Sequence, residues 1–147
     1  MREQDCKFTL ANFMRTHLYT SLGAIKVGND ELLREEGIKV DVIYGHGGLF
    51  KTEGVGQSVL AAALNTPVAV MKSAGEGGAW GMALLAAYMM QKENDEALCD
   101  YLENKVFAGA ASVVVEPDAG DVAGFEVFIE RYKAGLAIEQ AAVNVLK

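Results

Sequence analysis

Apolar residues in the first quarter of the chain recur every three or four positions. From residue 10 to residue 36 this spacing predicts one long helix with a buried stripe, and Gly37 stands where a glycine commonly ends a helix. His17 lies on the stripe, so we expect a hydrogen-bonded core residue rather than a ligand. The stripe comprises Leu10, Phe13, Met14, His17, Leu18, Ser21, Leu22 and Ile25.

The next segments alternate between strand and helix patterns. Residues 38–44 are β-branched and alternating, which predicts a strand. Residues 55–64 repeat at helical spacing and end before Pro67. Residues 68–71 predict a short buried strand, and residues 79–91 predict a helix that is apolar nearly all round and buried between layers. This order predicts a βαβ unit with two parallel strands.

The remaining third of the chain gives weaker patterns. Residues 94–105 predict a surface helix, residues 112–115 a short extended piece, and residues from Asp121 onward a C-terminal helix broken near Gly135. Two or three strands leave open sheet edges, so we expect either a homo-dimer through such an edge or a place in a larger sheet. We assign to the core a set of large side chains comprising Trp80, Met82, Met89 and Met90.

Composition indicates an ordinary globular protein. The 147 residues are 51% hydrophobic and 22% charged, which predicts a single domain over 1–147. The formal net charge of −7 argues against nucleic acid or an anionic membrane as the main partner. The near-apolar run 79–90 is shorter than the ~20 residues that cross a bilayer, and the first residues lack an apolar leader pattern. Two cysteines suit a reducing compartment, so we expect a cytoplasmic protein.

Glycine is concentrated in two clusters, each placed after a predicted strand. The first cluster spans residues 45–48, interrupted by His46, with Gly54 and Gly56 nearby. The second spans residues 75–78, interrupted by Glu76, with Gly81 nearby. Glycine gathers where the backbone needs a positive φ or where another group approaches closely. Because two such clusters follow two predicted parallel strands, we expect a built site rather than a linker.

Neither cluster fits the two best-known glycine motifs for phosphates. A P-loop requires glycine directly before the lysine, and Phe50 stands before Lys51. A dinucleotide fingerprint requires glycine at Phe50 or at Trp80. What remains is a strand and a Gly-Gly turn that opens a helix, an arrangement suited to a phosphate or ribose edge. We interpret Glu76 as a helix-start carboxylate, and the scattered His and Cys residues form no metal-ligand spacing.

The joint pattern of the two clusters is more specific. The strand and loop at 43–52 read IYGHGGLFKT, Gln57 lies in the following helix, Pro67 and Val68 begin the next strand, and residues 76–83 read EGGAWGMA. In this order the features resemble the C-terminal region of the FGGY carbohydrate kinases. The likeness extends from about Asn12 to the closing helix, and its loops are most similar to pentulose kinases of the ribulokinase and xylulokinase type.

This resemblance implies an α/β fold of the actin-like ATPase (ribonuclease H-like) type, here its C-terminal part, with a parallel βαβ core and long flanking helices. It implies ATP and Mg²⁺ as cofactors. Gly47 and Gly48 would pack against adenosine and its α-phosphate, Leu49 and Thr52 would line the nucleotide, and Lys51 could reach a phosphate.

The resemblance also implies what this region lacks. The aspartate base and the sugar pocket of these kinases belong to the N-terminal domain, so we assign no catalytic residue here and expect a pentulose to bind through that domain. Gln57 is expected to brace the loop, while His46 and Phe50 depart from the common pattern. Two alternatives stay open: a non-catalytic actin-like module that binds nucleotide or associates through its sheet edge, and a dehydrogenase fragment, which the failed fingerprint disfavours.

Overall fold

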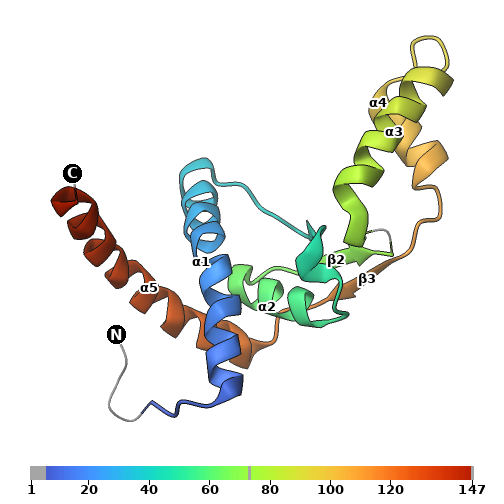
Figure 1. Ribbon diagram of the computed structural model, residues 1–147. Helices are drawn as coiled ribbons and strands as arrows, with labels where there is room; N and C mark the ends of the chain where they lie inside the picture. The colour runs from blue at the N-terminus through green and yellow to red at the C-terminus, as the bar shows by residue number, and fades with distance from the viewer. Residues whose placement is uncertain (1–5, 73, 147) are drawn as a thin grey trace.

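The computed structural model describes residues 6–72 and 74–146 (Figure 1). Three helices and a small sheet form the body, and an arm that begins with a fifteen-residue helix extends from the sheet. In chain order the elements are α1 (Leu10–Glu36), β1 (Ile43–Tyr44), the 3₁₀ turn η1 (Gly48–Phe50), α2 (Val55–Leu64), β2 (Val68–Met71), the 3₁₀ turn η2 (Ala74–Glu76), α3 (Gly77–Gln91), α4 (Leu98–Tyr101), the π-helical turn η3 (Leu102–Val106), β3 (Ser112–Val115) and α5 (Ala119–Val145).

The ends of α1 follow from local capping. The Thr9 hydroxyl accepts a hydrogen bond from the Asn12 backbone N–H at 3.2 Å, which satisfies one of the amides that a helix start leaves without a partner. At the other end Gly37 adopts φ 61° and donates its N–H to the Leu33 carbonyl. The predicted helix is therefore confirmed at both boundaries.

The sheet is mixed, with strand order β1-β2-β3. β1 pairs parallel to β2, with Ile43 opposite Val68, and β3 pairs antiparallel, with Val115 opposite Val68. The parallel β1–α2–β2 unit is confirmed. The prediction of a strand over all of 38–44 is wrong, because β2 begins opposite Ile43 and residues 38–42 have no strand partner in the described part of the chain.

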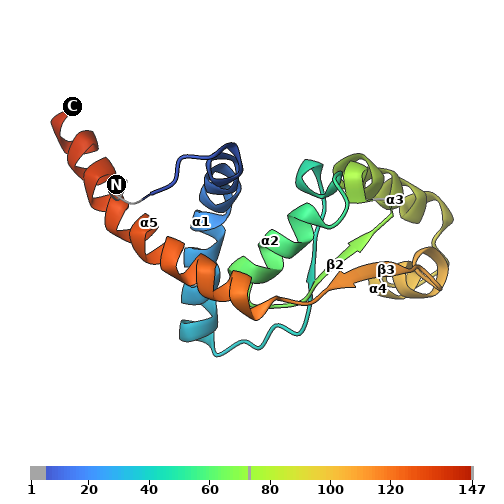
Figure 2. The same ribbon diagram turned by 90° about the horizontal axis from the view of Figure 1, so that it is seen from below.

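The core lies where α1, α2 and α5 meet one face of the sheet. Seven of the ten residues of α2 are buried, and this helix runs alongside β2 and β3 (Figure 2). Phe125 and Ile129 of α5 are fully buried there, and the Tyr19 ring of α1 lies 4.7 Å from that of Phe125. The main cluster consists of Leu22, Leu60, Ala61, Ala63, Leu64, Val68, Phe125 and Ile129.

The predicted burial of α3 is wrong. The helix forms, but none of its fifteen described residues is buried, and it extends away from the core together with α4 (Figure 1). It packs against the α4 segment through few contacts: the Tyr88 ring lies 5.4 Å from that of Tyr101, and the Tyr88 hydroxyl donates to the Glu96 carbonyl at 2.6 Å. The side chains assigned to the core are exposed: Trp80 44%, Met82 70%, Met89 78% and Met90 85%.

Leu22 is the one buried member of the predicted α1 stripe among the described residues, and Gly23 and Lys26 beside the stripe are also buried. His17 is exposed and its ring meets that of Phe13 edge-on at 4.5 Å, so the core assignment is wrong. Most of the stripe is exposed because α2 and α5 pack against only part of the length of α1. The exposed stripe residues include Leu10, Phe13, Met14 and Ile25.

Two further predictions need correction. The surface helix expected at 94–105 is a short α4 followed by the π-helical turn η3. The C-terminal helix runs through Gly135 without a break. Asp118 caps it by accepting from the Gly120 and Asp121 amides at 2.9 and 3.0 Å.

Within residues 6–72 and 74–146, the structure contains no helix both long and apolar enough to span a membrane.

Candidate functional site

The two glycine clusters lie at the same edge of the sheet. β1 leads directly into Gly45, and β2 leads into the segment that carries Gly75 and Gly77. Because the two strands are parallel, both clusters leave their carboxyl ends. In open α/β sheets ligands bind outside these ends. The two glycine loops therefore lie together at the edge of the sheet where a ligand could bind.

The first loop turns at Gly47, which adopts φ 101° and starts the 3₁₀ turn η1. The Phe50 and Lys51 amides close the turn by donating to the Gly47 and Gly48 carbonyls at 3.1 and 3.2 Å. At both Gly47 and Gly48 a Cβ would meet no described atom within 4 Å apart from chain neighbours. The space above the two glycines is therefore open to a ligand.

Phe50, which breaks the P-loop motif, has a packing role. A Cβ at Gly45 would collide with the Phe50 ring, so the ring occupies the space that the first glycine leaves. Phe50 is half-buried and packs against the core. The aromatic ring thus anchors the turn from below, and glycine at Gly45 is required by this contact rather than by a ligand.

The two loops contact each other through side chains. The Lys51 Nζ lies 2.9 Å from the Glu76 Oε1, and both side chains are exposed. A Cβ at Gly77 would lie 3.0 Å from the Cβ of His46, so His46 packs against the start of α3. Sequence reasoning treated these residues separately. The structure joins them into one rim of loop residues around the Gly-Gly turn.

The other predicted nucleotide contacts differ in exposure. Thr52 is exposed beyond the turn. Leu49 is half-buried and packs against the core, and a Cβ at Gly56 would collide with its carbonyl oxygen. Thr52 is therefore accessible from solvent, whereas the Leu49 side chain is turned mainly toward the protein.

Gln57 braces the sheet. Its side chain is buried, and Nε2 donates to the Val68 carbonyl at 3.2 Å and to the Val113 carbonyl at 2.9 Å. The expectation that Gln57 braces the glycine loop thus needs correction: its amide holds α2 against β2 and β3. A buried amide placed opposite two backbone carbonyls is well suited to this role, because both of its N–H groups find acceptors.

A cavity of about 360 Å³ lies beside the first loop. Lys51 and Lys72 line it together with Glu53. Lys72 follows directly after β2 and was missed by sequence reasoning, although its position one residue beyond a predicted parallel strand was a usable signal. The charges of Lys51 and Lys72 are matched by Glu53 in the same cavity and by Glu76, which pairs with Lys51. The two lysines are nevertheless the cations of this edge that could contact a phosphate.

Comparison with protein families identifies the chain. Residues 1–90 match the model of the FGGY family of carbohydrate kinases, C-terminal domain. The chain belongs to the FGGY family of carbohydrate kinases. Comparison with curated proteins and with solved structures found no significant match. The family is one of phosphotransferases, and a small mixed sheet with flanking helices is compatible with part of its actin-like ATPase fold.

The family match covers both glycine loops and ends within α3. α4, β3 and α5 lie beyond it, and so does the tail that contributed to the resemblance. The assignment to this family therefore rests on the part of the chain that carries the candidate site. The pentulose kinase subtype is a finer statement that the match does not include.

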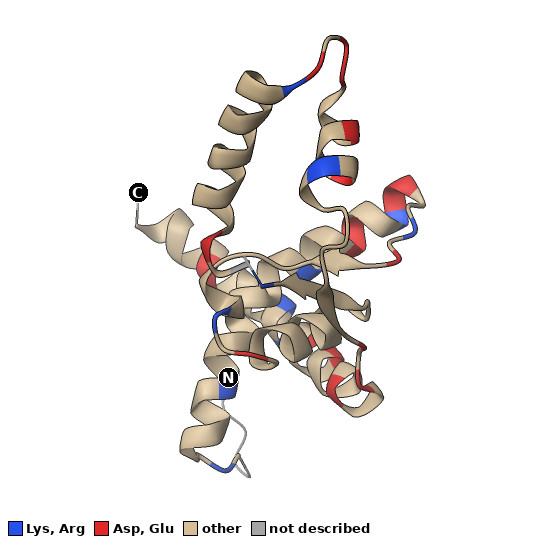
Figure 3. Ribbon diagram, turned by 90° about the vertical axis from the view of Figure 1, so that its right-hand side faces the viewer, with Lys and Arg blue, Asp and Glu red and all other residues tan. Residues whose placement is uncertain are grey.

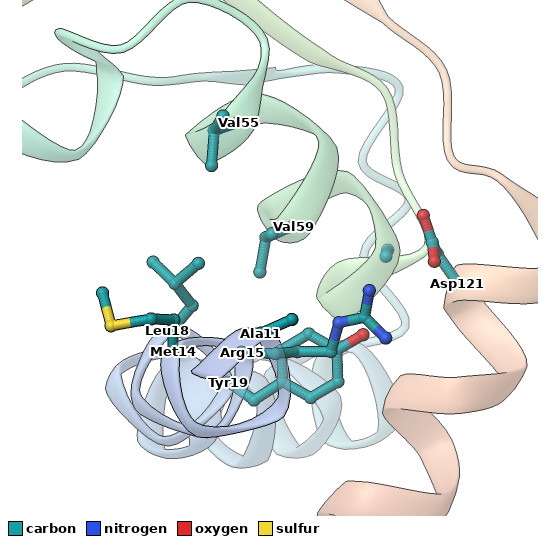
Figure 4. A pocket seen from close by; sticks show the side chains of 9 residues that line it. Ala11, Met14, Arg15, Leu18, Tyr19, Val55, Val59 and Asp121 are labelled. Carbon is teal, nitrogen blue, oxygen red and sulfur yellow. The ribbon is translucent and has the colours of Figure 1, made fainter. Parts of the chain in front are cut away.

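A second hollow of the FGGY chain lies on the other side of α2. It has a volume of about 270 Å³ and separates α1 from the first turns of α2 (Figure 4). Met14 and Leu18 face Val55 and Val59 across it, so its walls are mostly apolar. Arg15 and Asp121 lie toward one side of it (Figure 4). The hollow shows that α1 and α2 are incompletely packed next to the glycine loop.

Asp41 and Asp118 have separate structural roles. Asp41 forms an ion pair with Lys39 at 2.9 Å, and Asp118 caps α5. In the part of the chain that the structure describes, no group of three or more His, Cys, Asp or Glu side chains is placed to hold a metal ion. The candidate site therefore consists of the open Gly-Gly turn, Lys51, Lys72 and Glu76.

Proposed function

We propose that this FGGY chain supplies the ATP-binding part of a cytoplasmic sugar kinase, and that the intact enzyme transfers the γ-phosphate of ATP to a pentulose of the ribulose or xylulose type. The observation that carries the proposal is the Gly-Gly turn at the carboxyl end of β1, with open space above both glycines. Membership of the FGGY family supplies the reaction class.

In this proposal the adenosine and α-phosphate lie over Gly47 and Gly48. Neither position offers a Cβ that would fill the space, so a flat ligand can approach the backbone closely. Thr52 lines the exposed side of the nucleotide, and Leu49 contributes through its backbone while its side chain anchors the loop. These roles follow from the resemblance together with the open turn.

Lys51 is the proposed phosphate contact. In the free protein its ammonium pairs with Glu76, so binding a phosphate requires the side chain to exchange partners. Exposed ion pairs contribute only about 0–1 kcal/mol, so Lys51 loses little free energy when it exchanges Glu76 for a phosphate. Lys72, which lines the adjacent cavity, gives the phosphates a second cation.

Catalysis in this proposal requires the other half of a kinase. The chemistry of phosphoryl transfer is mainly positioning and charge stabilisation, with Mg²⁺ bridging the phosphates. We place the base and the sugar pocket in the family's N-terminal domain and assign no catalytic residue to this chain. The uncharged helix α3, none of whose described residues is buried, supports the need for a further apolar layer (Figure 3). In Figure 3 its ribbon carries no charged colour along its length.

Calorimetric titration of the chain with MgATP tests the proposal, with NAD as the control ligand. The informative variant is Gly48→Val, because the free protein has room for the new side chain and Gly48 has no positive φ. We expect at least about tenfold weaker ATP binding, a loss of about 1.4 kcal/mol.

The matched control is Gly28→Val, at an exposed position of α1 where a Cβ also meets no described atom within 4 Å. It should leave ATP binding unchanged, and circular dichroism should show both variants folded. Equal ATP affinity in wild type and Gly48→Val would remove the turn from the site. Sugar-dependent ADP release should stay at background for a panel of pentuloses, and turnover by the chain alone would contradict the need for a second half.

A further inference from the structure

The hollow between α1 and α2 is small and has apolar walls on two sides. Its volume of about 270 Å³ lies just below the roughly 300–1,000 Å³ of sites for drug-sized ligands, so a fitting ligand is smaller than these. Side chains three or four positions apart on each helix face one another across it (Figure 4). We call it the α1–α2 hollow, and its apolar walls consist of Ala11, Met14, Leu18, Val55, Val59 and Ala62.

The two charged side chains that line the α1–α2 hollow have opposite signs and lie at one side of it. Arg15 comes from α1 and Asp121 from the first turn of α5 (Figure 4). Within residues 6–72 and 74–146, neither the guanidinium nor the carboxylate has an ion-pair partner. The Asp121 carboxylate is not needed as a helix cap, because Asp118 accepts the hydrogen bonds of the first free amides of α5. Both groups are therefore available to a ligand, and their charges sum to zero.

The wall formed by Tyr19 is held firmly by the core. Its ring borders the hollow and lies 4.7 Å from the ring of Phe125 and 5.3 Å from that of Phe128. Phe125 is fully buried, so this contact anchors α1 to the start of α5. The elements that carry Arg15 and Asp121 are therefore fixed relative to each other.

We propose that the α1–α2 hollow binds a free apolar α-amino acid of about the size of leucine or methionine. Such a molecule carries its ammonium and its carboxylate on one carbon atom, so both charges reach the same side of a site. The carboxylate accepts charge-assisted hydrogen bonds from the Arg15 guanidinium, and the ammonium donates to the Asp121 carboxylate. The aliphatic side chain lies between the apolar walls of α1 and α2, where burial of its surface is favourable.

The opposite charges distinguish this ligand class from others. A simple anion would pair with Arg15 and face Asp121, and a simple cation would do the reverse. A neutral apolar molecule would cover both charged groups without giving either a partner, which costs free energy. Only a zwitterion with an apolar part satisfies both charges and both walls.

This inference is independent of the nucleotide proposal. None of the residues that line the α1–α2 hollow belongs to residues 45–52 or to the cavity that Lys51 and Lys72 line. The hollow is built on α1, α2 and the start of α5, whereas the nucleotide turn lies at the carboxyl end of β1. Binding at one site can therefore be lost without loss at the other.

The test is a titration of the ¹⁵N-labelled whole chain with L-leucine, followed by the amide shifts of residues 11–19 and 55–62. Three analogues each lack one feature of leucine: 4-methylpentanoate lacks the ammonium, 3-methylbutylamine lacks the carboxylate, and L-alanine lacks most of the apolar side chain. We expect each analogue to bind at least about tenfold more weakly than leucine, because each loses a charge-assisted contact or buried apolar surface.

Two variants assign the charged contacts separately. Arg15→Gln should weaken leucine binding at least about tenfold and leave the binding of 3-methylbutylamine unchanged, because that ligand has no carboxylate. Asp121→Asn should weaken leucine binding by a similar factor and leave 4-methylpentanoate unchanged. Both side chains are exposed, so the core stays intact, and circular dichroism should confirm that both variants fold.

Matched controls lie elsewhere on the chain. Arg34→Gln removes an exposed arginine from the last turn of the same helix, and Asp100→Asn removes an acid from the first turn of α4. Neither variant should change leucine binding. Gly48→Val, which alters the nucleotide turn, should also bind leucine normally.

Three outcomes would overturn the inference. The first is absence of leucine-dependent shifts at residues 11–19 and 55–62, the second is an analogue that binds as tightly as leucine, and the third is unchanged leucine affinity in both Arg15→Gln and Asp121→Asn. Loss of ATP binding with retained leucine binding would contradict the nucleotide proposal alone. The reverse result would contradict the amino-acid site alone.

Discussion

α2 and α3 carry no charged residue, yet their surroundings are opposite. Seven of the ten residues of α2 are buried between α1, α5 and the sheet, whereas none of the fifteen described residues of α3 is buried. Figure 3 shows the difference in space, with α3 and α4 extending together from the sheet, away from the other helices. An apolar sequence thus indicates that a helix is stabilised by burial, but whether another element covers that helix depends on the rest of the fold.

This contrast divides the chain into a packed body and an apolar arm. The body contains the core cluster around Phe125 and Ile129 and fixes the first glycine loop through Phe50. The arm consists of α3, α4 and η3 and touches the body mainly through the two loops and the sheet. The candidate nucleotide site lies at their junction, because Lys51 belongs to the body and its partner Glu76 directly precedes α3 of the arm.

The largest expected effect tests the difference in burial directly. Phe125→Ala removes a fully buried ring from the body and should lower the free energy of unfolding by about 3–5 kcal/mol. Met89→Ala removes a side chain that is 78% exposed on the arm and should change it by no more than about 0.5 kcal/mol. Urea denaturation followed by circular dichroism measures both. Similar losses would contradict the division into body and arm.

The next effect concerns the contact between α2 and the sheet from which the arm extends. Gln57→Leu removes the amide that donates to the Val68 and Val113 carbonyls, and we expect a loss of about 1–3 kcal/mol from the unsatisfied acceptors. Hydrogen exchange should quicken at the amides of β3. Gln140→Leu, at an exposed position of α5, is the matched control and should change neither quantity. Unchanged exchange in β3 would show that Gln57 does not hold the strand.

A smaller effect should appear in alkali. Burial lowers the pKa of Lys26, but its hydrogen bonds to Glu126 and Asp30 outweigh burial, so the pKa is raised above its ordinary value. The ion pairs therefore stabilise the body below the unfolded pKa of about 10.4, and this contribution is lost as pH rises through the folded pKa. Thermal melts from pH 8 to 11 should fall less steeply for Lys26→Met. An identical slope in both proteins would contradict the assignment.

The smallest effect concerns the open edge of the sheet. Among residues 6–72 and 74–146, β3 pairs only with β2, and Val113 and Val114 are 58% and 49% exposed. We expect the isolated chain to self-associate through such an edge, because its free backbone groups can pair with a second copy. Val113→Lys should shift the distribution toward monomer in sedimentation velocity with little change in stability. A wild-type chain that stays monomeric at high concentration would contradict this expectation.

Local signals in the sequence were sufficient for several elements. The bounds of α1 follow from the Thr9 cap and Gly37, and β2 follows from its short β-branched run. The meeting of the glycine loops follows from the parallel pairing of β1 and β2. These features depend on residues close in sequence or on one topological rule.

Other features depend on which layers come together, and periodicity alone does not contain that information. His17 and Met89 have the spacing of core residues but no layer covers them. The roles of Gln57 and Phe50 depend on contacts with distant backbone, and the pairing of Lys51 with Glu76 spans 25 residues. Sequence reasoning predicted that the two loops lie together and did not predict the side-chain contacts that join them.

The most direct test of the central claim is amide chemical-shift mapping of the ¹⁵N-labelled chain with MgATP. The account predicts shifts at residues 45–52, Lys72 and residues 74–77, with only the first set responding to adenosine. Gly48→Val should abolish these shifts and Gly28→Val should retain them. Shifts confined to α1 and α5, or no shifts at residues 45–52, would contradict a nucleotide site on the Gly-Gly turn.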